Sequence, residues 1–181
     1  MEKETKEKRQ TKKNLKFSRE FSAGGVVVKT SQNLWLVTKS AKSKLFPKSF
    51  WRLPKGWLDD RQNGKTPGPL ASGEKRASQN DLENAAQREV REEAGVDAKI
   101  LQKIGSETYF LNIGRRRILK FVTFFLMEWE KDFPEGPGFE TEEVLWLSYA
   151  EACNILTHKG EKEVLHQAKE ILDRGIQSVL I

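Results

Sequence analysis

The chain of 181 residues is poor in cysteine and histidine, the residues that form disulfides and zinc sites. Its single cysteine, Cys153, cannot form an internal disulfide, so nothing points to an oxidising compartment. There are only two histidines, at positions 158 and 166. No apolar run approaches the roughly 18 residues that a membrane-spanning helix needs, and no apolar secretion signal stands at the N-terminus. We therefore predict a cytoplasmic protein that does not associate with membranes.

The remaining composition is that of a folded domain with one unusual end. Hydrophobic residues make up 37% of the chain and five of them are tryptophan, which is enough to build a core at this length. The formal net charge of +6 is uneven, because residues 1–20 carry eight Lys or Arg against four Glu. We predict a basic, disordered tail over residues 1–19 and a single domain over 20–181. Such a tail can also contact RNA phosphates.

The order of apolar segments predicts the fold class. Strands are expected over 23–28, 34–37, 100–109, 118–127 and 144–147, and helices over 81–94 and near the C-terminus. Residues 61–80 contain five Gly or Pro and show no periodicity, so they are predicted to be a loop insertion. This order predicts an α/β fold in which a mixed β-sheet is sandwiched between α-helices.

The helix expected over 81–94 carries the most informative pattern. Asn80 is the expected N-cap, with Glu83 as its capping-box partner, and Gly95 is the expected left-handed residue at its end. At about 100° per residue, the small and apolar side chains define one inward face. That face comprises Leu82, Ala85, Ala86 and Val90.

Three carboxylates share this inward face. Glu89 and Glu93 fall within about 20° of Leu82, and Glu92 within about 80°. Burying like charges is costly unless a cation neutralises them. Carboxylate oxygens suit Mg²⁺ or Mn²⁺, and no His or Cys is close in the sequence for a zinc site. We predict a metal site at Glu89, Glu92 and Glu93; the alternative is a charged helix with pairs such as Arg88–Glu92.

The same helix carries a recognisable motif. The run Arg88–Val96, R-E-V-R-E-E-A-G-V, matches the second half of the Nudix box, R-E-U-x-E-E-x-G-U with U aliphatic, and Leu53–Gly56 resembles the segment that opens it. Arg88 follows Gly56 by 32 positions where the pattern has 14, so about 18 residues are inserted. The first glutamate of the box would fall on Asn80, and Glu74 is the candidate replacement.

Over roughly residues 20–173 the chain resembles the Nudix hydrolase superfamily, and within it the bacterial diadenosine tetraphosphate hydrolase branch. Segments that resemble this branch are 21–26, 51–56, 120–127, 146–147 and 156–165. The resemblance implies a Nudix fold and an enzyme that hydrolyses phosphoric anhydride bonds by water attack, using Mg²⁺ or Mn²⁺.

The resemblance also implies roles for individual residues. Glu89, Glu92 and Glu93 would hold the metal, with Arg88 orienting Glu89. Family members commonly use a later glutamate as a further ligand or base. For this role we choose Glu140 over its neighbours Glu142 and Glu143, and the alternative is an exposed acidic turn.

The substrate prediction depends on aromatic and cationic residues. Tyr109 lies near the tyrosine that marks dinucleoside polyphosphate hydrolases and could stack on adenine; the alternative is ordinary strand packing. Arg52, Lys55 and Lys120 are the candidate phosphate-binding cations. We predict hydrolysis of diadenosine tetraphosphate to ATP and AMP.

Other substrates and one other class of function stay open. The enzymatic alternatives are an oxidised-nucleotide diphosphatase acting on 8-oxo-dGTP, a 5′-RNA pyrophosphohydrolase and an inositol pyrophosphate hydrolase. The alternative of another class is a non-catalytic Nudix domain that binds RNA or nucleotides.

Overall fold

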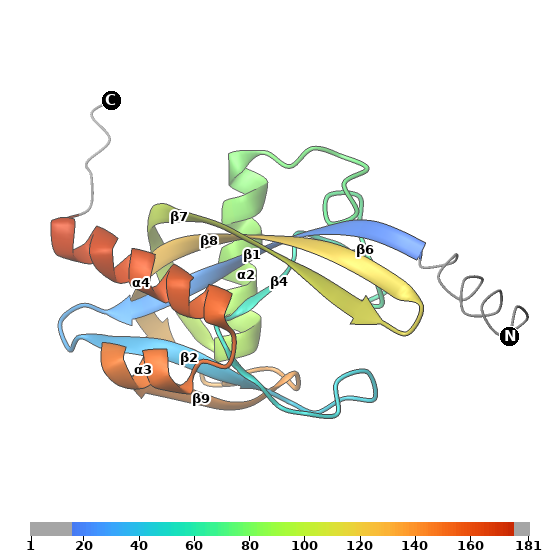
Figure 1. Ribbon diagram of the computed structural model, residues 1–181. Helices are drawn as coiled ribbons and strands as arrows, with labels where there is room; N and C mark the ends of the chain where they lie inside the picture. Colours follow the sequence, from blue (N-terminus) through green and yellow to red (C-terminus); the bar gives the residue numbers. More distant parts are fainter. Residues whose placement is uncertain (1–15, 176–181) are drawn as a thin grey trace, which may run out of the picture.

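The computed structural model describes residues 16–175, with one mixed β-sheet at the centre. Its strands are β1 (Lys16–Lys29), β2 (Leu34–Ser40), β3 (Trp51–Arg52), β4 (Lys55–Trp57), β7 (Val96–Ile113), β8 (Arg116–Asp132) and β9 (Thr141–Leu147). The main path is β3-β2-β1-β8-β7, with β4 paired to β1 and β9 to β2. Strand β1 is antiparallel to β2 and β4 but parallel to β8 (Figure 1). The predicted mixed sheet is confirmed.

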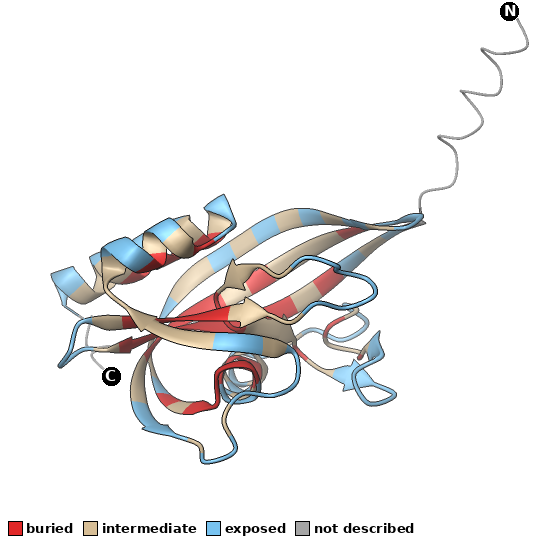
Figure 2. Ribbon diagram, turned by 90° about the horizontal axis from the view of Figure 1, so that it is seen from below, coloured by how far each residue is buried: buried red, intermediate tan, exposed pale blue. Residues whose placement is uncertain are grey.

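Helices cover both faces of this sheet. Helix α2 (Gln79–Ala94) packs on one face, and α3 (Tyr149–Ile155) and α4 (Lys159–Arg174) pack on the other (Figure 1). Ala23 and Val27 of β1 belong to the core cluster under α2, whereas Val26 and Val28 belong to the cluster under α3 and α4. A strand buried on both faces is apolar at consecutive positions, and Figure 2 shows this burial along the central strands.

The strands extend further than the sequence predicted. Strand β1 begins at Lys16, and residues 16–19 pair with residues 116–119 of β8. The predicted tail boundary at residue 19 is therefore wrong, because these polar residues gain their backbone partners from a strand that is distant in the sequence. Residues 1–15, on which the predicted disorder and RNA contact of the tail depend, lie outside the described residues.

The C-terminal helical region is only partly as predicted. The apolar stripe of α4 is buried at Val164, Leu165 and Ala168, as its spacing predicts. The short helix α3 was not predicted; its N-cap is Ser148, whose capping box with Glu151 forms both reciprocal bonds. Within residues 16–175, no helix has the length and apolar character needed to cross a membrane.

The insertion is fastened to the sheet. It contains a two-stranded ribbon, β5 (Asp60–Arg61) and β6 (Thr66–Pro67), and ends at Ser78, two residues earlier than predicted. The Asp59 carboxylate accepts hydrogen bonds from the backbone N–H groups of Leu70 (3.2 Å) and Ala71 (2.7 Å). The Ala71 carbonyl in turn accepts a bond from the Phe21 N–H of β1 at 2.8 Å. The insertion thus has a fixed position beside β1.

Candidate active site

Helix α2 begins two residues earlier than predicted. Ser78, not Asn80, is the N-cap: its hydroxyl accepts a bond from the Asp81 N–H (3.2 Å), and the Asp81 carboxylate accepts one from the Ser78 N–H (2.8 Å). Asp81 therefore takes the capping-box place assigned to Glu83. The helix ends as predicted at Gly95, which has a left-handed φ of 68°.

Two carboxylates of α2 are buried on its inner face, as the helical pattern predicted. Burial raises the pKa of Glu89 to about 8, because Arg88 offsets the lost solvation only in part and Glu93 and Glu92 add repulsion. Burial likewise raises the pKa of Glu93 above its usual value, although Arg52 favours its ionised form. Strongly perturbed carboxyl groups of this kind are typical of functional sites.

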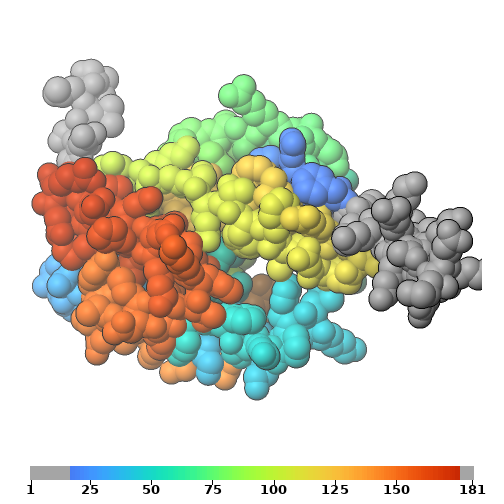
Figure 3. Space-filling model, viewed as in Figure 1, coloured from blue at the N-terminus to red at the C-terminus, as the bar shows by residue number. Residues whose placement is uncertain are grey.

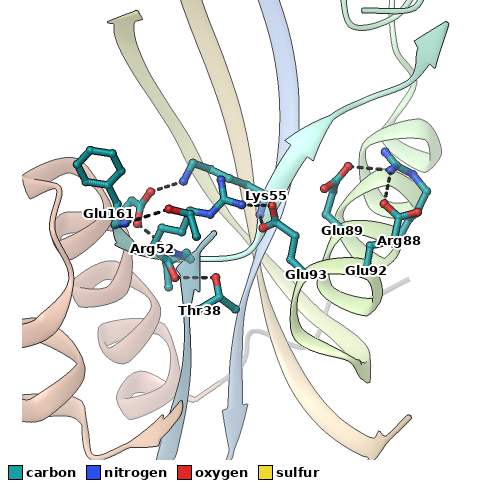
Figure 4. A network of polar contacts seen from close by, with 11 residues as sticks. Thr38, Arg52, Lys55, Arg88, Glu89, Glu92, Glu93 and Glu161 are labelled. Atoms are coloured by element: carbon teal, nitrogen blue, oxygen red, sulfur yellow. Dashed lines mark hydrogen bonds and ion pairs between the residues drawn. The ribbon is translucent and has the colours of Figure 1, made fainter. Parts of the chain in front are cut away.

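The segment 51–57 lies against the inner face of α2 (Figure 4). The Arg52 guanidinium forms an ion pair with Glu93 Oε1, and the Lys55 backbone N–H donates to Glu93 Oε2 over 2.9 Å. Arg52 Nε is buried without a hydrogen-bond partner in the part of the chain that the structure describes. Arg52 therefore keeps one donor available for an oxygen ligand.

Glu89 is positioned by backbone on one side and by an arginine on the other. A Cβ at Gly56 would lie 2.2 Å from Glu89 Oε2, so only glycine leaves room for this carboxylate. Arg88 Nη1 lies 2.8 Å from Glu89 Oε1, and Arg88 Nη2 donates to the Trp57 carbonyl over 2.7 Å. Arg88 thus links Glu89 to the end of β4, and its orienting role stays a prediction.

The third carboxylate, that of Glu92, lies on the exposed surface of α2 and not on its inner face as predicted. The Glu92 side chain is 57% exposed, and its Oε2 lies 3.0 Å from Arg88 Nη1. The prediction that Glu92 turns inward with Glu89 and Glu93 is therefore wrong: about 80° from Leu82, it lies where the helix surface meets solvent. The i,i+4 pair Arg88–Glu92, which was the alternative interpretation, is present.

Of the three glutamates that precede or begin β9, Glu140 affects one of the α2 carboxylates, that of Glu93. Its charge is among the causes that raise the pKa of Glu93. Glu142 instead pairs with Lys39 at 3.1 Å, and Glu143 lies 3.9 Å from the same ammonium group. This placement favours the choice of Glu140, whose role stays a prediction.

A second buried ion pair supports the same segment from the α4 side. Glu161, buried in the first turn of α4, accepts a 2.9 Å bond from the Leu53 N–H and pairs with the Lys55 ammonium (Figure 4). Burial by itself lowers the pKa of Lys55, but the Glu161 carboxylate and Tyr109 act in the opposite direction, and the pKa lies above its usual value. Sequence reasoning missed Glu161 as a functional residue, because its partners lie 106 and 108 positions earlier.

The other candidate substrate residues lie on β7 and β8. Lys120 Nζ lies 3.6 Å from Glu20 Oε2 and 5.8 Å from the centre of the Trp57 ring. Burial lowers the pKa of Lys120, with Lys55 acting in the same direction. Tyr109 is partly buried against the core cluster under α3 and α4, and burial raises its pKa.

Figure 3 shows the surface hollowed between the yellow β7–β8 hairpin, the cyan segment before β3 and the start of α4.

Glu74 lies in the insertion, and its hydrogen bonds are to other residues of the insertion. It accepts bonds from Arg61 (2.7 Å) and from the Ser72 hydroxyl (3.1 Å), and it is exposed. These two contacts hold it within the insertion. Its replacement of the first glutamate of the motif stays a prediction.

The donor chemistry of the site fits a hard divalent cation. The carboxylates are those of Glu89, Glu92, Glu93 and Glu140. All offer oxygen donors, which Mg²⁺ and Mn²⁺ prefer. Within residues 16–175, no three acidic, His or Cys side chains already surround one point. Arg88 and Arg52 occupy these carboxylates instead, so they would have to yield contacts to a bound cation.

The burial of Glu89 predicts a pH-dependent stability. In metal-free buffer, Glu89→Gln should leave the free energy of unfolding nearly unchanged at pH 5 and raise it at pH 9. The pKa of Glu89 is about 8 in the folded state against a usual value of 4.5. The stability that the neutral Glu89 side chain contributes to the wild type is therefore full below about pH 4.5 and is lost as pH rises through 8. Glutamine stays neutral, so its gain at pH 9 should be on the order of 5 kcal/mol.

Urea unfolding at the two pH values measures this difference. Glu83→Gln, the same change at a less buried position of α2, is the matched control and should follow the wild type. Equal stability of Glu89→Gln and wild type at pH 9 would show that Glu89 ionises there at no cost.

Comparisons with known proteins connect this site to a family. A sequence profile described as the NUDIX domain matches residues 19–168. Over 124 residues, 68% of this chain, the sequence is 27% identical to a Mycobacterium tuberculosis protein described as the mutator protein MutT4. That match covers 43% of the mutator protein, so the chain spans less than half the length of this curated relative.

Solved structures show the same fold. The MutT protein of Methanosarcina mazei Go1 superimposes with a TM-score of 0.60 at 14% identity, over 86% of this chain and 96% of that one. A C. elegans Ap4A hydrolase in a binary complex gives 0.57 at 19% identity, over 86% and 99%. At these identities the likeness shows the fold alone, and it confirms the predicted α/β architecture.

Proposed function

The chain belongs to the NUDIX family, and from this premise we propose that it is a metal-dependent hydrolase of pyrophosphate bonds in a nucleoside polyphosphate. The observation that carries this proposal is the carboxylate set of α2, in which Glu89 and Glu93 are buried with raised pKa values and Glu92 is exposed beside them. Family members generally need a divalent ion such as Mg²⁺ or Mn²⁺. We further propose a cytoplasmic location.

Some residues of the site would hold the ion, and others would hold the substrate. A bound divalent ion neutralises phosphate charge and lowers the pKa of a bound water. Glu89, Glu92 and Glu93 would hold it, with Arg88 keeping Glu89 in place. Glu140 would complete the site as a further ligand or as the base that accepts a proton from water.

The substrate we propose is diadenosine tetraphosphate, cleaved to ATP and AMP. Lys55, Lys120 and Arg52, with its available Nε donor, supply the positive charge that four linked phosphates require. Tyr109 offers an aromatic ring near Lys55 for one adenine. The similarity of fold to an Ap4A hydrolase supports this choice.

Product analysis distinguishes the candidate substrates. Diadenosine tetraphosphate, 8-oxo-dGTP, triphosphorylated RNA and an inositol pyrophosphate are each incubated with the chain in Mg²⁺ or Mn²⁺. ATP and AMP in equal amounts, formed fastest from the first substrate, are the expected result. If none of the four compounds is cleaved while nucleotide or RNA still binds, the chain is a binding domain and not an enzyme.

A second candidate is favoured by one observation. The identity to a protein described as a mutator protein favours a diphosphatase of oxidised nucleotides. On that alternative, 8-oxo-dGTP would be converted to its monophosphate and pyrophosphate faster than diadenosine tetraphosphate is cleaved.

A further inference from the structure

One end of the sheet carries an aromatic and basic surface that the proposed reaction does not use. The start of β1 and the β7–β8 hairpin extend together beyond the helices (Figure 1). In this register Phe17 pairs with Arg117, Phe21 with Phe121, and Phe110 with Leu119. Because side chains alternate along a strand, one face of this extension carries four phenylalanines and two arginines. We name it the sheet platform: Phe17, Arg19, Phe21, Phe110, Arg117 and Phe121.

The platform exposes aromatic rings that a core would normally cover. Phe17 is 54% and Phe110 50% exposed. The Arg117 guanidinium lies 4.1 Å above the Phe110 ring, and the rings of Phe21 and Phe121 stack with their centres 5.1 Å apart. Planar groups exposed on a strand surface are what unpaired nucleobases stack on.

The charges around the platform have one dominant sign. The register adds no acidic residue to this face between residues 108–112 of β7, 117–121 of β8 and 17–21 of β1. The adjoining insertion, counted from Asp60 at the start of β5 to residue 78, contains four basic residues and two acidic residues. Its Ser72 and Gly73 line an open hollow together with Phe17, Arg19 and Phe21. Residues 1–15, which lead into β1, contain six basic and three acidic residues.

The platform lies on the α2 face of the sheet, where Phe21 borders the core cluster under α2, and the candidate substrate residues of β7 and β8 lie on the other face. Lys120, Tyr109 and Glu20 alternate with the platform residues and therefore lie on the opposite face of the same strands. The Glu20 carboxylate pairs there with Lys120 and receives the Trp57 ring N–H. Changes at Phe17 and Phe110 thus leave the substrate-binding side chains in place.

We propose that the sheet platform binds single-stranded RNA. Bases stack on Phe17 and on the Arg117–Phe110 pair, and Arg19 and Arg117 meet the phosphates. The exposed side chains of Thr108 and Asn112, on either side of Phe110 along β7, offer hydrogen-bonding groups for ribose 2′-hydroxyls. Binding of this kind tolerates many base sequences and weakens with salt.

Fluorescence anisotropy of the full chain with labelled U12 tests the proposal, in EDTA and over a series of KCl concentrations from 50 to 200 mM. Wild type should bind U12 saturably and more tightly than dT12. Phe17→Ala/Phe110→Ala should weaken U12 binding at least tenfold. Phe139→Ala, which removes a 92% exposed ring outside the platform, is the matched control and should bind as wild type does.

A second variant covers the case in which the aromatic double variant does not fold, as judged by circular dichroism. Arg19→Gln/Arg117→Gln should weaken binding and reduce the slope of log affinity against log salt by about one or more. Absence of saturable U12 binding at 50 mM KCl would overturn the proposal. So would wild-type affinity in a folded platform variant, an equal loss in Phe139→Ala, or binding of dT12 as tight as that of U12.

Discussion

Glu92→Gln should lower turnover of diadenosine tetraphosphate in Mg²⁺ about a thousandfold while leaving the unfolding transition unchanged. The side chain is 57% exposed, so its loss removes no core contact. Its loss would, however, take one negative charge from the set that holds the cation. A thousandfold loss corresponds to about 4 kcal/mol of transition-state stabilisation, a size consistent with impaired metal-ion catalysis. Steady-state kinetics and urea unfolding of the same preparation measure both quantities.

Two further variants show whether that loss is specific. Glu83→Gln makes the same chemical change on the same helix, outside the carboxylate set, and should retain wild-type turnover. Glu93→Gln should lose at least as much activity as Glu92→Gln, but its stability should also change because Arg52 loses an ionised partner. Near-normal turnover of both Glu92→Gln and Glu93→Gln would contradict the metal assignment.

Lys55→Met should destabilise the fold by about 3–5 kcal/mol, because it leaves the buried Glu161 carboxylate without its cation. The Leu53 N–H would remain as the backbone donor to that carboxylate. Urea unfolding followed by fluorescence of the five tryptophans measures the change.

The double variant Lys55→Met/Glu161→Gln isolates the charge. Glutamine is neutral and its amide oxygen still accepts the Leu53 N–H, so the double variant should recover at least half of the lost stability. A loss below about 1 kcal/mol in Lys55→Met would show that Glu161 does not depend on this pair.

The parts of the site that sequence reasoning could predict are those whose cause is local. Burial of Glu89 and Glu93 follows from the 3.6-residue period and from small neighbours such as Ala85 and Ala86. Glu92, at the edge of that face, was wrongly predicted to be buried. A helical wheel gives the direction of a side chain around the helix but not how far the sheet extends beneath it.

The N-cap shows a limit of a different kind. Ser78 with Asp81, and Asn80 with Glu83, both have capping-box spacing. Local preference alone does not separate these two starts of α2.

The remaining features depend on contacts between distant parts of the chain. Glu161 stands among the polar residues of an amphipathic helix, and its burial follows from Lys55 and Leu53, more than 100 positions earlier. Strand β1 likewise begins at Lys16 because residues of β8 supply its hydrogen-bond partners. Neither feature leaves a periodic signal in the local sequence.

Binding of Mn²⁺ to the nucleotide-free chain, followed by electron paramagnetic resonance, measures whether the α2 carboxylates hold the divalent ion. The result does not depend on the identity of the substrate. The wild type and Glu83→Gln should bind Mn²⁺ saturably with the same affinity, and Glu92→Gln should bind at least tenfold more weakly. Equal affinity of Glu92→Gln and wild type, or no saturable binding to the wild type, would contradict a metal site at these carboxylates.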